Sequence, residues 1–201
     1  RNDNWIDIGL EAHFSDQFRT CLDSVDNDKY LLHIQGDTSY ENWPGFISNA
    51  EYYMKKYNAG IYYPHIRNQY WSLRKNSEID IETDDQNIIH VACGDETVWV
   101  IAPEILKYIS DYNIRECFDH DKYGYGWDLC ICSISFLLGL PVIRDLNHLI
   151  EHPRGCGYNK RLASESLEIT MSKLPETIRT IISDIWNDRD NISQHLYKNS
   201  N

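Results

Sequence analysis

The stretch Tyr30-Leu31-Leu32-His33-Ile34-Gln35-Gly36-Asp37 indicates the fold. Its first five residues have the length and apolar composition of a β-strand, and a polar loop follows at once. In open α/β sheets, ligands bind beyond the carboxyl ends of the strands, so Asp37 is well placed to meet a metal ion or a phosphate. Gly36 would let a bulky ligand approach the backbone. The same residues also fit an ordinary turn, and this segment alone favours the turn.

Outward from this stretch, the apolar pattern predicts alternating helices and strands. The segment 93–96 is expected to be a hairpin turn. Pro64 is expected to end a short strand, and the segment 65–87 is expected to be an irregular substrate loop. The pattern predicts a single α/β domain over 1–201, with one mixed, mainly parallel sheet flanked by helices. The expected helices are 14–22, 46–57, 103–112, 128–138 and about 175–186. The expected strands are 5–9 (equally a loop), 30–34, 61–63, 87–92, 97–101, 140–145 and 148–152.

Charge and composition exclude several partners. The formal net charge is −12, from 31 acidic and 19 basic side chains, and no sizeable Lys/Arg cluster occurs. This argues against binding to nucleic acid or to an anionic membrane surface. No apolar stretch has the length of a membrane span, and no signal-peptide pattern is seen. The six cysteines include no CxxC pair, which argues against a zinc site and favours reduced thiols in the cytoplasm.

A second motif, Tyr123-Gly124-Tyr125-Gly126-Trp127-Asp128, alternates glycine with aromatic residues and ends in a carboxylate at the start of a helix. The glycines allow a sharp turn, and the Tyr and Trp rings offer a platform on which a sugar ring can stack. Asp128 would then lie at the edge of the platform, where it can take a proton from a hydroxyl. The alternative is that Asp128 only caps the helix.

A third motif begins at His152, which stands before Pro153 and is therefore expected to have an extended backbone. It leads into a glycine-containing basic loop with Arg154, Lys160 and Arg161. In an otherwise acidic chain, this loop is the best local place for a diphosphate. The alternatives are a packed or surface histidine and a solvated charged loop.

The order of these motifs resembles the GT-A class of nucleotide-sugar-dependent glycosyltransferases over about residues 5–165. In that class an Asp-x-Asp-like motif after a strand holds a divalent metal, a Gly-Trp-(Gly/Asp) segment opens a helix near the acceptor, and a late His completes the metal site. Gln35-Gly36-Asp37 matches the first motif, although Gln35 replaces its first acidic residue. Gly126-Trp127-Asp128 matches the second motif, and His152 matches the late ligand. The compact size also resembles GT-A domains in multi-domain glycosyltransferases of large algal viruses, which would place the protein in the host cytoplasm.

The resemblance implies metal-dependent transfer of a sugar from a nucleotide diphosphate sugar, expected to be a UDP-sugar, to a glycan hydroxyl. Asp37 and His152 would hold Mn²⁺ or Mg²⁺. If the reaction inverts the anomeric centre, Asp128 is the expected general base, and if it retains it, Asp128 positions a hydroxyl. Asp95 is a second candidate catalytic or acceptor-binding carboxylate. The remaining expected contacts are Gln35, Gly36, Arg154 and Lys160 with the donor, and Tyr125, Gly126 and Trp127 with the acceptor.

Two other functions compete with this one. A non-catalytic carbohydrate-binding module would use the aromatic loops to stack sugars without a metal. A metal phosphodiesterase would need more clustered His and Asp ligands than the sequence offers. The transferase hypothesis requires that Asp37 and His152 meet in one cavity.

Overall fold

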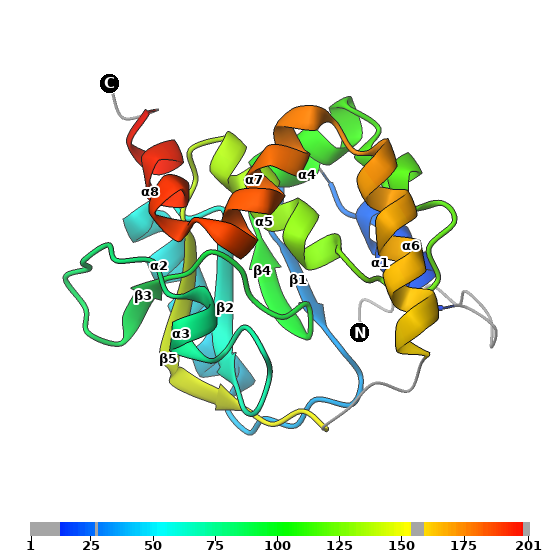
Figure 1. Ribbon diagram of the computed structural model, residues 1–201. Coiled ribbons are helices and arrows are strands. Elements are labelled where there is room, and N and C mark those ends of the chain that lie inside the picture. Colours follow the sequence, from blue (N-terminus) through cyan, green and yellow to red (C-terminus); the bar gives the residue numbers. More distant parts are fainter. Residues whose placement is uncertain (1–12, 27, 154–158, 199–201) are drawn as a thin grey trace.

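The computed structural model describes residues 13–26, 28–153 and 159–198. Over these residues the chain forms one five-stranded sheet with the strand order β1-β4-β2-β5-β3, and helices flank both of its faces (Figure 1). The α/β class with a single mixed sheet is therefore confirmed. The strand expected over 5–9 lies outside the described residues. The strands are β1 (Leu31–Ile34), β2 (Ile61–Ile66), β3 (Ile88–His90), β4 (Val98–Ile101) and β5 (Val142–Ile150).

The expectation of a mainly parallel sheet is wrong. Only β2 and β5 pair in parallel, whereas β1 with β4, β4 with β2, and β3 with β5 are antiparallel. The cause is β4, which inserts between β1 and β2 and runs opposite to both. The helix-containing connection from β1 to β2 therefore joins two strands of the same direction that are not neighbours.

The expected hairpin between β3 and β4 is also wrong. β3 is the edge strand beside β5, and β4 lies on the other side of β2. The connection 91–97 therefore crosses the sheet instead of turning back on itself, and it packs closely. A Cβ on Gly94 would lie 2.5 Å from the ring of Tyr63. Pro64 does not end β2, which continues to Ile66.

Helices cover the two faces of the sheet unequally. α2 (Trp43–Tyr57) packs on one face through Phe46, Ala50 and Met54, and Figure 1 shows it behind the sheet. α5 (Trp127–Leu137) lies on the other face and is buried along almost its whole length, because α7 (Glu176–Asn187) packs over it. The remaining helices are α1 (Phe14–Ser24), α3 (Arg74–Ser77), α4 (Pro103–Asp111), the 3-10 helix η1 (Ile114–Phe118), α6 (Lys160–Lys173) and α8 (Arg189–Lys198).

All five expected helices are confirmed within a few residues, but the short α3 and η1 and the longer α6 and α8 were not expected. The reason is clear for α6, whose buried positions are Ala163, Ser166 and Thr170. Small and polar side chains leave no apolar stripe for sequence analysis to detect. Among the described residues, no helix combines the length and the apolar character needed to cross a membrane.

A bulge in β5 interrupts its pairing with β2. Pro64 pairs with Asp145, but the next residue of β2, His65, pairs with Leu149. Residues 146–148 therefore have no counterpart in β2. After the bulge the strand continues in register to Ile150 and delivers the segment that contains His152.

A buried polar network holds this bulge. The Asp145 carboxylate accepts hydrogen bonds from the Tyr62 hydroxyl (2.7 Å) and from Nδ2 of Asn49 (3.0 Å). The ring nitrogens of His148 lie 2.9 Å from Nδ2 of Asn49 and 2.6 Å from the Tyr40 hydroxyl. Burial lowers the pKa of His148, so its ring is neutral near pH 7. The polar side chains of the bulge, Asp145 and His148, thus have hydrogen-bond partners, and the bulge is a stable part of the fold.

We expect Asp145→Ala to lower the free energy of unfolding by at least about 2 kcal/mol, because it leaves the buried donors of Tyr62 and Asn49 without an acceptor. Denaturant unfolding measures this loss. Asp111→Ala is the control, since it removes an exposed carboxylate paired with Lys107 on α4 and should cost no more than about 0.5 kcal/mol. Equal losses in the two variants would contradict the structural role of Asp145.

Candidate active site

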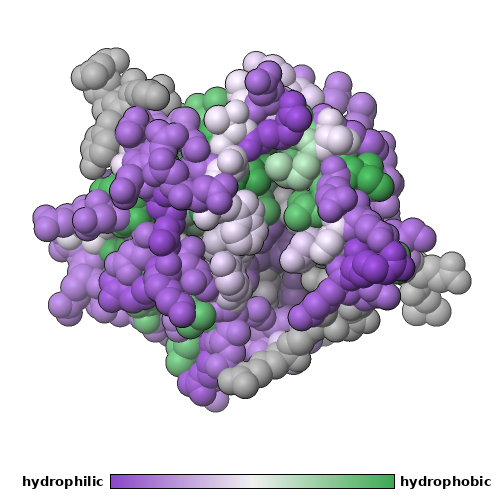
Figure 2. Space-filling model, viewed as in Figure 1, coloured by the Kyte–Doolittle hydropathy of each residue, from purple (hydrophilic) through white to green (hydrophobic). Residues whose placement is uncertain are grey.

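One cavity of about 980 Å³ collects most of the residues singled out in the sequence. Its lining comes from the loop after β1, the segment 69–71, the connection between β3 and β4, the loop before α5, His152, and the end of α7. Figure 2 shows the viewed face hollowed near its centre, between hydrophilic surfaces. A cavity of this volume lies at the upper end of the range for small-molecule sites.

Asp37 and His152 meet in this cavity. Their loops are joined by two backbone hydrogen bonds, from the Ser39 N–H to the Glu151 carbonyl (2.9 Å) and from the Glu151 N–H to the Ser39 carbonyl (3.2 Å). Oδ1 of Asp37 consequently lies 3.2 Å from Nε2 of His152. The His152 side chain is only 10% exposed, whereas that of Asp37 is 59% exposed. The pair therefore has one buried member and one that faces solvent.

This pair combines two side-chain types that can bind metal ions, a carboxylate and an imidazole. Nε2 of His152 is buried and makes no well-aligned hydrogen bond in the structure, in spite of its short distance to Asp37. The other ring nitrogen, Nδ1, lies 2.8 Å from the side-chain amide nitrogen of Gln69, which donates to it and leaves the ring proton on Nε2, facing Asp37. Nε2 can bind a metal only when the Gln69 amide turns so that its oxygen accepts a proton from Nδ1. The carboxylate is a typical ligand of Mn²⁺ and Mg²⁺, whereas imidazole is more typical of transition-metal sites.

The protein supplies only part of such a coordination shell. Among the described residues, no group of three or more His, Cys, Asp and Glu side chains is arranged to hold a metal ion. Asp37 and His152 would therefore hold the ion together with oxygen atoms from a bound ligand and water.

Two carboxylates that each have one unpartnered oxygen line the same cavity. Oδ2 of Asp95 and Oε2 of Glu96 are buried and have no hydrogen-bond partner. Burial, together with the nearby charge of Asp128, raises the pKa of Asp95 to about 7. Burial also raises the pKa of Glu96 well above its usual range. Asp95 is therefore partly protonated near neutral pH, and the unpartnered oxygens of both groups are open to hydrogen bonds with ligand hydroxyls.

Asp128 lies in the first turn of α5 and reaches the cavity with a fixed orientation. Its Oδ2 accepts a hydrogen bond from Nε1 of Trp71 (3.1 Å), and its Oδ1 accepts one from the Leu129 N–H (2.8 Å). Burial raises its pKa to about 6, while these hydrogen bonds act in the opposite direction. At pH 7 the carboxylate is mostly ionised, and its pKa is close enough to neutrality for proton transfer.

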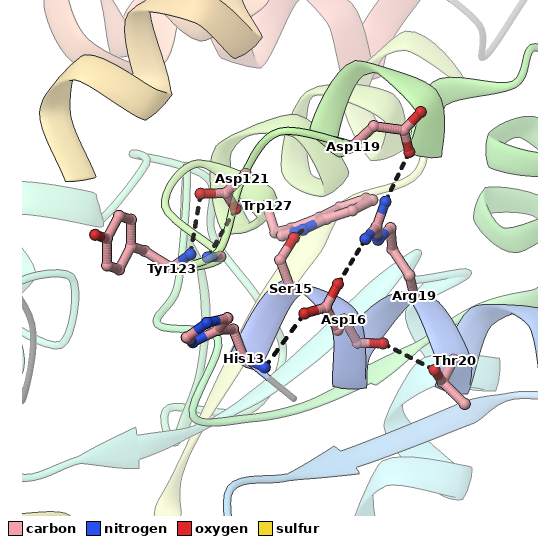
Figure 3. Close-up of polar contacts among 10 residues, drawn as sticks. His13, Ser15, Asp16, Arg19, Thr20, Asp119, Asp121, Tyr123 and Trp127 are labelled. Atoms are coloured by element: carbon pink, nitrogen blue, oxygen red, sulfur yellow. Dashed lines mark hydrogen bonds and ion pairs between the residues drawn. The ribbon is translucent and has the colours of Figure 1, made fainter. Parts of the chain in front are cut away.

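The glycine-aromatic loop before α5 is held by a residue that the sequence analysis missed. Figure 3 shows the Asp121 carboxylate accepting hydrogen bonds from the backbone N–H groups of Tyr123 (3.1 Å) and Gly124 (2.7 Å). Gly124 has a φ of +76°, and a Cβ there would lie 2.0 Å from the Phe14 ring. The pattern Asp-x-x-Gly was the available signal, since Asp side chains commonly accept from the backbone of a following turn.

Trp127 does not present its ring to the cavity. It is fully buried, stacks on Phe118 with ring centroids 3.7 Å apart, and donates from Nε1 to the Ser15 hydroxyl (3.0 Å). The sugar-stacking surface expected at this indole is therefore absent, because the ring is needed to anchor the loop to α1. Tyr125 and Gly126 do line the cavity.

The expected donor-binding residues divide into two groups. Gln35 lines the cavity, whereas Gly36 does not, and the space beside its Cα is open. Lys160 is exposed at the start of α6 and is not part of the lining. Arg154 lies outside the described residues. Lys122, which the sequence analysis did not single out, is a cation that lines the cavity.

Comparison with protein-family models, with curated proteins and with solved structures found no match to this chain.

We expect Asp95→Asn to stabilise the protein at pH 8. A carboxyl group whose pKa is raised in the folded state binds a proton that the unfolded chain has released, so stability falls as pH rises from about 4 to about 7. One pKa unit corresponds to about 1.4 kcal/mol, and we expect a gain of at least this size at pH 8 and almost none near pH 4.

Urea unfolding of wild type and variant over this pH range measures the difference. Asp111→Asn, at a half-exposed position of α4, controls for the loss of one negative charge. A difference between wild type and Asp95→Asn that does not grow from pH 4 to pH 8 would contradict the raised pKa.

Proposed function

We propose that this protein is a metal-dependent glycosyltransferase of the GT-A class, which moves a sugar from a nucleotide diphosphate sugar, expected to be a UDP-sugar, to a hydroxyl group of a glycan. The observation that carries the proposal is the 3.2 Å contact between Oδ1 of Asp37 and the buried Nε2 of His152, in a cavity that also contains Asp128. This contact brings together the first and the last of the three motifs found in the sequence. A cytoplasmic location stays a prediction from the cysteine pattern.

The charge of the cavity supports the need for a cation. Four acidic side chains line it: Asp37, Asp95, Glu96 and Asp128. Among its described lining residues, Lys122 is the one lysine. A diphosphate would be repelled by so many carboxylates unless a positive ion came between them. A divalent ion at Asp37 and His152 would stabilise the departing diphosphate as a Lewis acid.

The other carboxylates suit the acceptor. In an inverting transfer, a bond forms between the acceptor oxygen and the anomeric carbon while the bond from that carbon to the diphosphate breaks. Asp128 takes the proton of the acceptor hydroxyl, and the Trp71 N–H keeps its carboxylate oriented. Asp95 and Glu96 can exchange hydrogen bonds with neighbouring sugar hydroxyls in either protonation state.

A non-catalytic carbohydrate-binding module is the alternative function. Aromatic side chains in the cavity agree with either function, but buried carboxylates with raised pKa values are more typical of catalytic sites. The two functions differ in their requirements. A binding module would bind glycans equally well without metal and would not hydrolyse a nucleotide sugar.

We expect UDP to raise the melting temperature of the protein when Mn²⁺ is present and not when EDTA replaces it, because the ion and the diphosphate bind jointly. Asp37→Ala and His152→Ala should abolish this shift. Glu151→Gln is the matched control, since Glu151 neighbours His152 but pairs with Arg67 at the surface. An unchanged shift in Asp37→Ala would contradict the metal assignment, and a metal-independent shift would contradict the proposed function.

We expect Asp128→Asn to lower the rate of sugar release by about 100-fold, since an amide cannot accept the proton. The substrate is whichever UDP-sugar the wild type hydrolyses most rapidly with Mn²⁺ in a screen of UDP-sugars, and released UDP is measured. The wild-type rate should fall as pH drops below about 6, where Asp128 becomes protonated. The UDP-dependent melting shift should persist in the variant. An unchanged rate would contradict the role of Asp128 as the base.

A further inference from the structure

Three aromatic side chains form one wall of the cavity. Two of them lie in the segment 65–87 that the sequence predicted to be a substrate loop, and the third was assigned no function. Tyr70 and Trp71 come from the segment after β2, and Trp186 comes from the end of α7. The Trp71 and Trp186 rings lie 4.8 Å apart, and the Tyr70 ring lies 5.0 Å from Trp71 and 6.1 Å from Trp186. We call these three residues the aromatic wall.

The aromatic wall has a buried base and an exposed surface. Trp71 is 5% exposed, whereas Tyr70 and Trp186 are 53% and 50% exposed. The isoleucines of α7, including Ile182 and Ile185, are buried in the core. Trp186 is thus the large apolar side chain of this helix that remains half in solvent, and it is in the lining of the cavity.

We propose that the aromatic wall is an acceptor subsite, where a sugar ring of an oligosaccharide stacks against Trp186 and Tyr70. A pyranose ring has an apolar face of C–H groups, which packs against the negative face of an aromatic ring, and an edge of hydroxyl groups. The cavity offers both kinds of partner, because the aromatic wall shares it with the unpartnered carboxylate oxygens of Asp95 and Glu96. An apolar peptide would leave these oxygens unsatisfied. Figure 2 shows side chains of intermediate hydropathy beside the hollow.

A hydrogen bond places the aromatic wall at the acceptor end of the cavity. Nε1 of Trp71 donates to Oδ2 of Asp128, the proposed base. The base must contact the acceptor hydroxyl, so a ring stacked on Trp186, which packs directly on Trp71, belongs to the acceptor and not to the nucleobase of the donor. The assignment of this subsite to the acceptor rests on the proposed function. The stacking of an oligosaccharide on the aromatic wall does not depend on catalysis.

An array of immobilised oligosaccharides of defined structure tests the subsite. The fluorescently labelled protein is applied with MnCl₂ and UDP, and again with EDTA and no nucleotide. We expect Trp186→Ala and Tyr70→Ala each to weaken binding to the oligosaccharides recognised by the wild type by at least tenfold. Trp186→Phe keeps a ring and should stay within threefold. Tyr112→Ala removes an exposed tyrosine after α4, outside the cavity lining, and should behave like the wild type.

The melting shift produced by UDP and Mn²⁺ is measured on each variant and separates the two proposals. A normal shift with lost oligosaccharide binding supports the subsite and shows that the variant is folded. A lost shift in Trp186→Ala, with Tyr112→Ala normal, assigns the wall to the donor and overturns the subsite. Oligosaccharide binding that the variants retain, or no binding by the wild type under either condition, also overturns it. If the wild type binds oligosaccharides through the wall but shows no UDP shift, the subsite stands and the transferase fails.

Discussion

The pair of backbone hydrogen bonds between Ser39 and Glu151 is the constraint on which the site depends. These bonds tie the loop after the edge strand β1 to the end of β5, although β4 and β2 separate the two strands in the sheet. β5 reaches this point only because its bulge is held by the buried network around Asp145 and because the strand then resumes pairing with β2. The carboxylate of Asp37 and the imidazole of His152 meet as a consequence.

The cavity concentrates negative charge at a cost in stability. Asp95 and Glu96 are desolvated, and each has one buried oxygen without a hydrogen-bond partner. Backbone hydrogen bonds to Asp95 and the charge of Arg144 offset part of this cost. Arg144 on β5 is 1% exposed, donates to the Ser77 hydroxyl and the Cys93 carbonyl, and lowers the pKa of Asp95 by its charge. Such an arrangement is expected where carboxylates serve a ligand, since selection for stability alone would replace them.

Some of the aromatic residues around the site are structural, and others face the cavity. Trp127 is wholly inside and fixes the glycine-aromatic loop, whereas Trp71 is buried but donates to the Asp128 carboxylate. Trp186 and Tyr70 line the cavity and are about half exposed to solvent. Under the proposed function, the orientation of the base and the binding of the acceptor are coupled, because both depend on the position of Trp71.

Local pattern was sufficient to locate five of the helices and part of each strand, though not α6 and α8, and to place Asp37 after a strand and Asp128 at the start of a helix. Apolar periodicity reports which side of an element is buried, and glycine, proline and capping residues report where it ends. The partner and direction of each strand were decided only by the tertiary structure, because they depend on contacts between distant segments. Thus β4 inserts between β1 and β2, the connection carrying Asp95 and Glu96 crosses the sheet, and Trp127 faces the core while Trp186 faces the cavity. The sequence shows that a residue is large and apolar, but only tertiary packing decides whether its ring lies in the core or at the cavity.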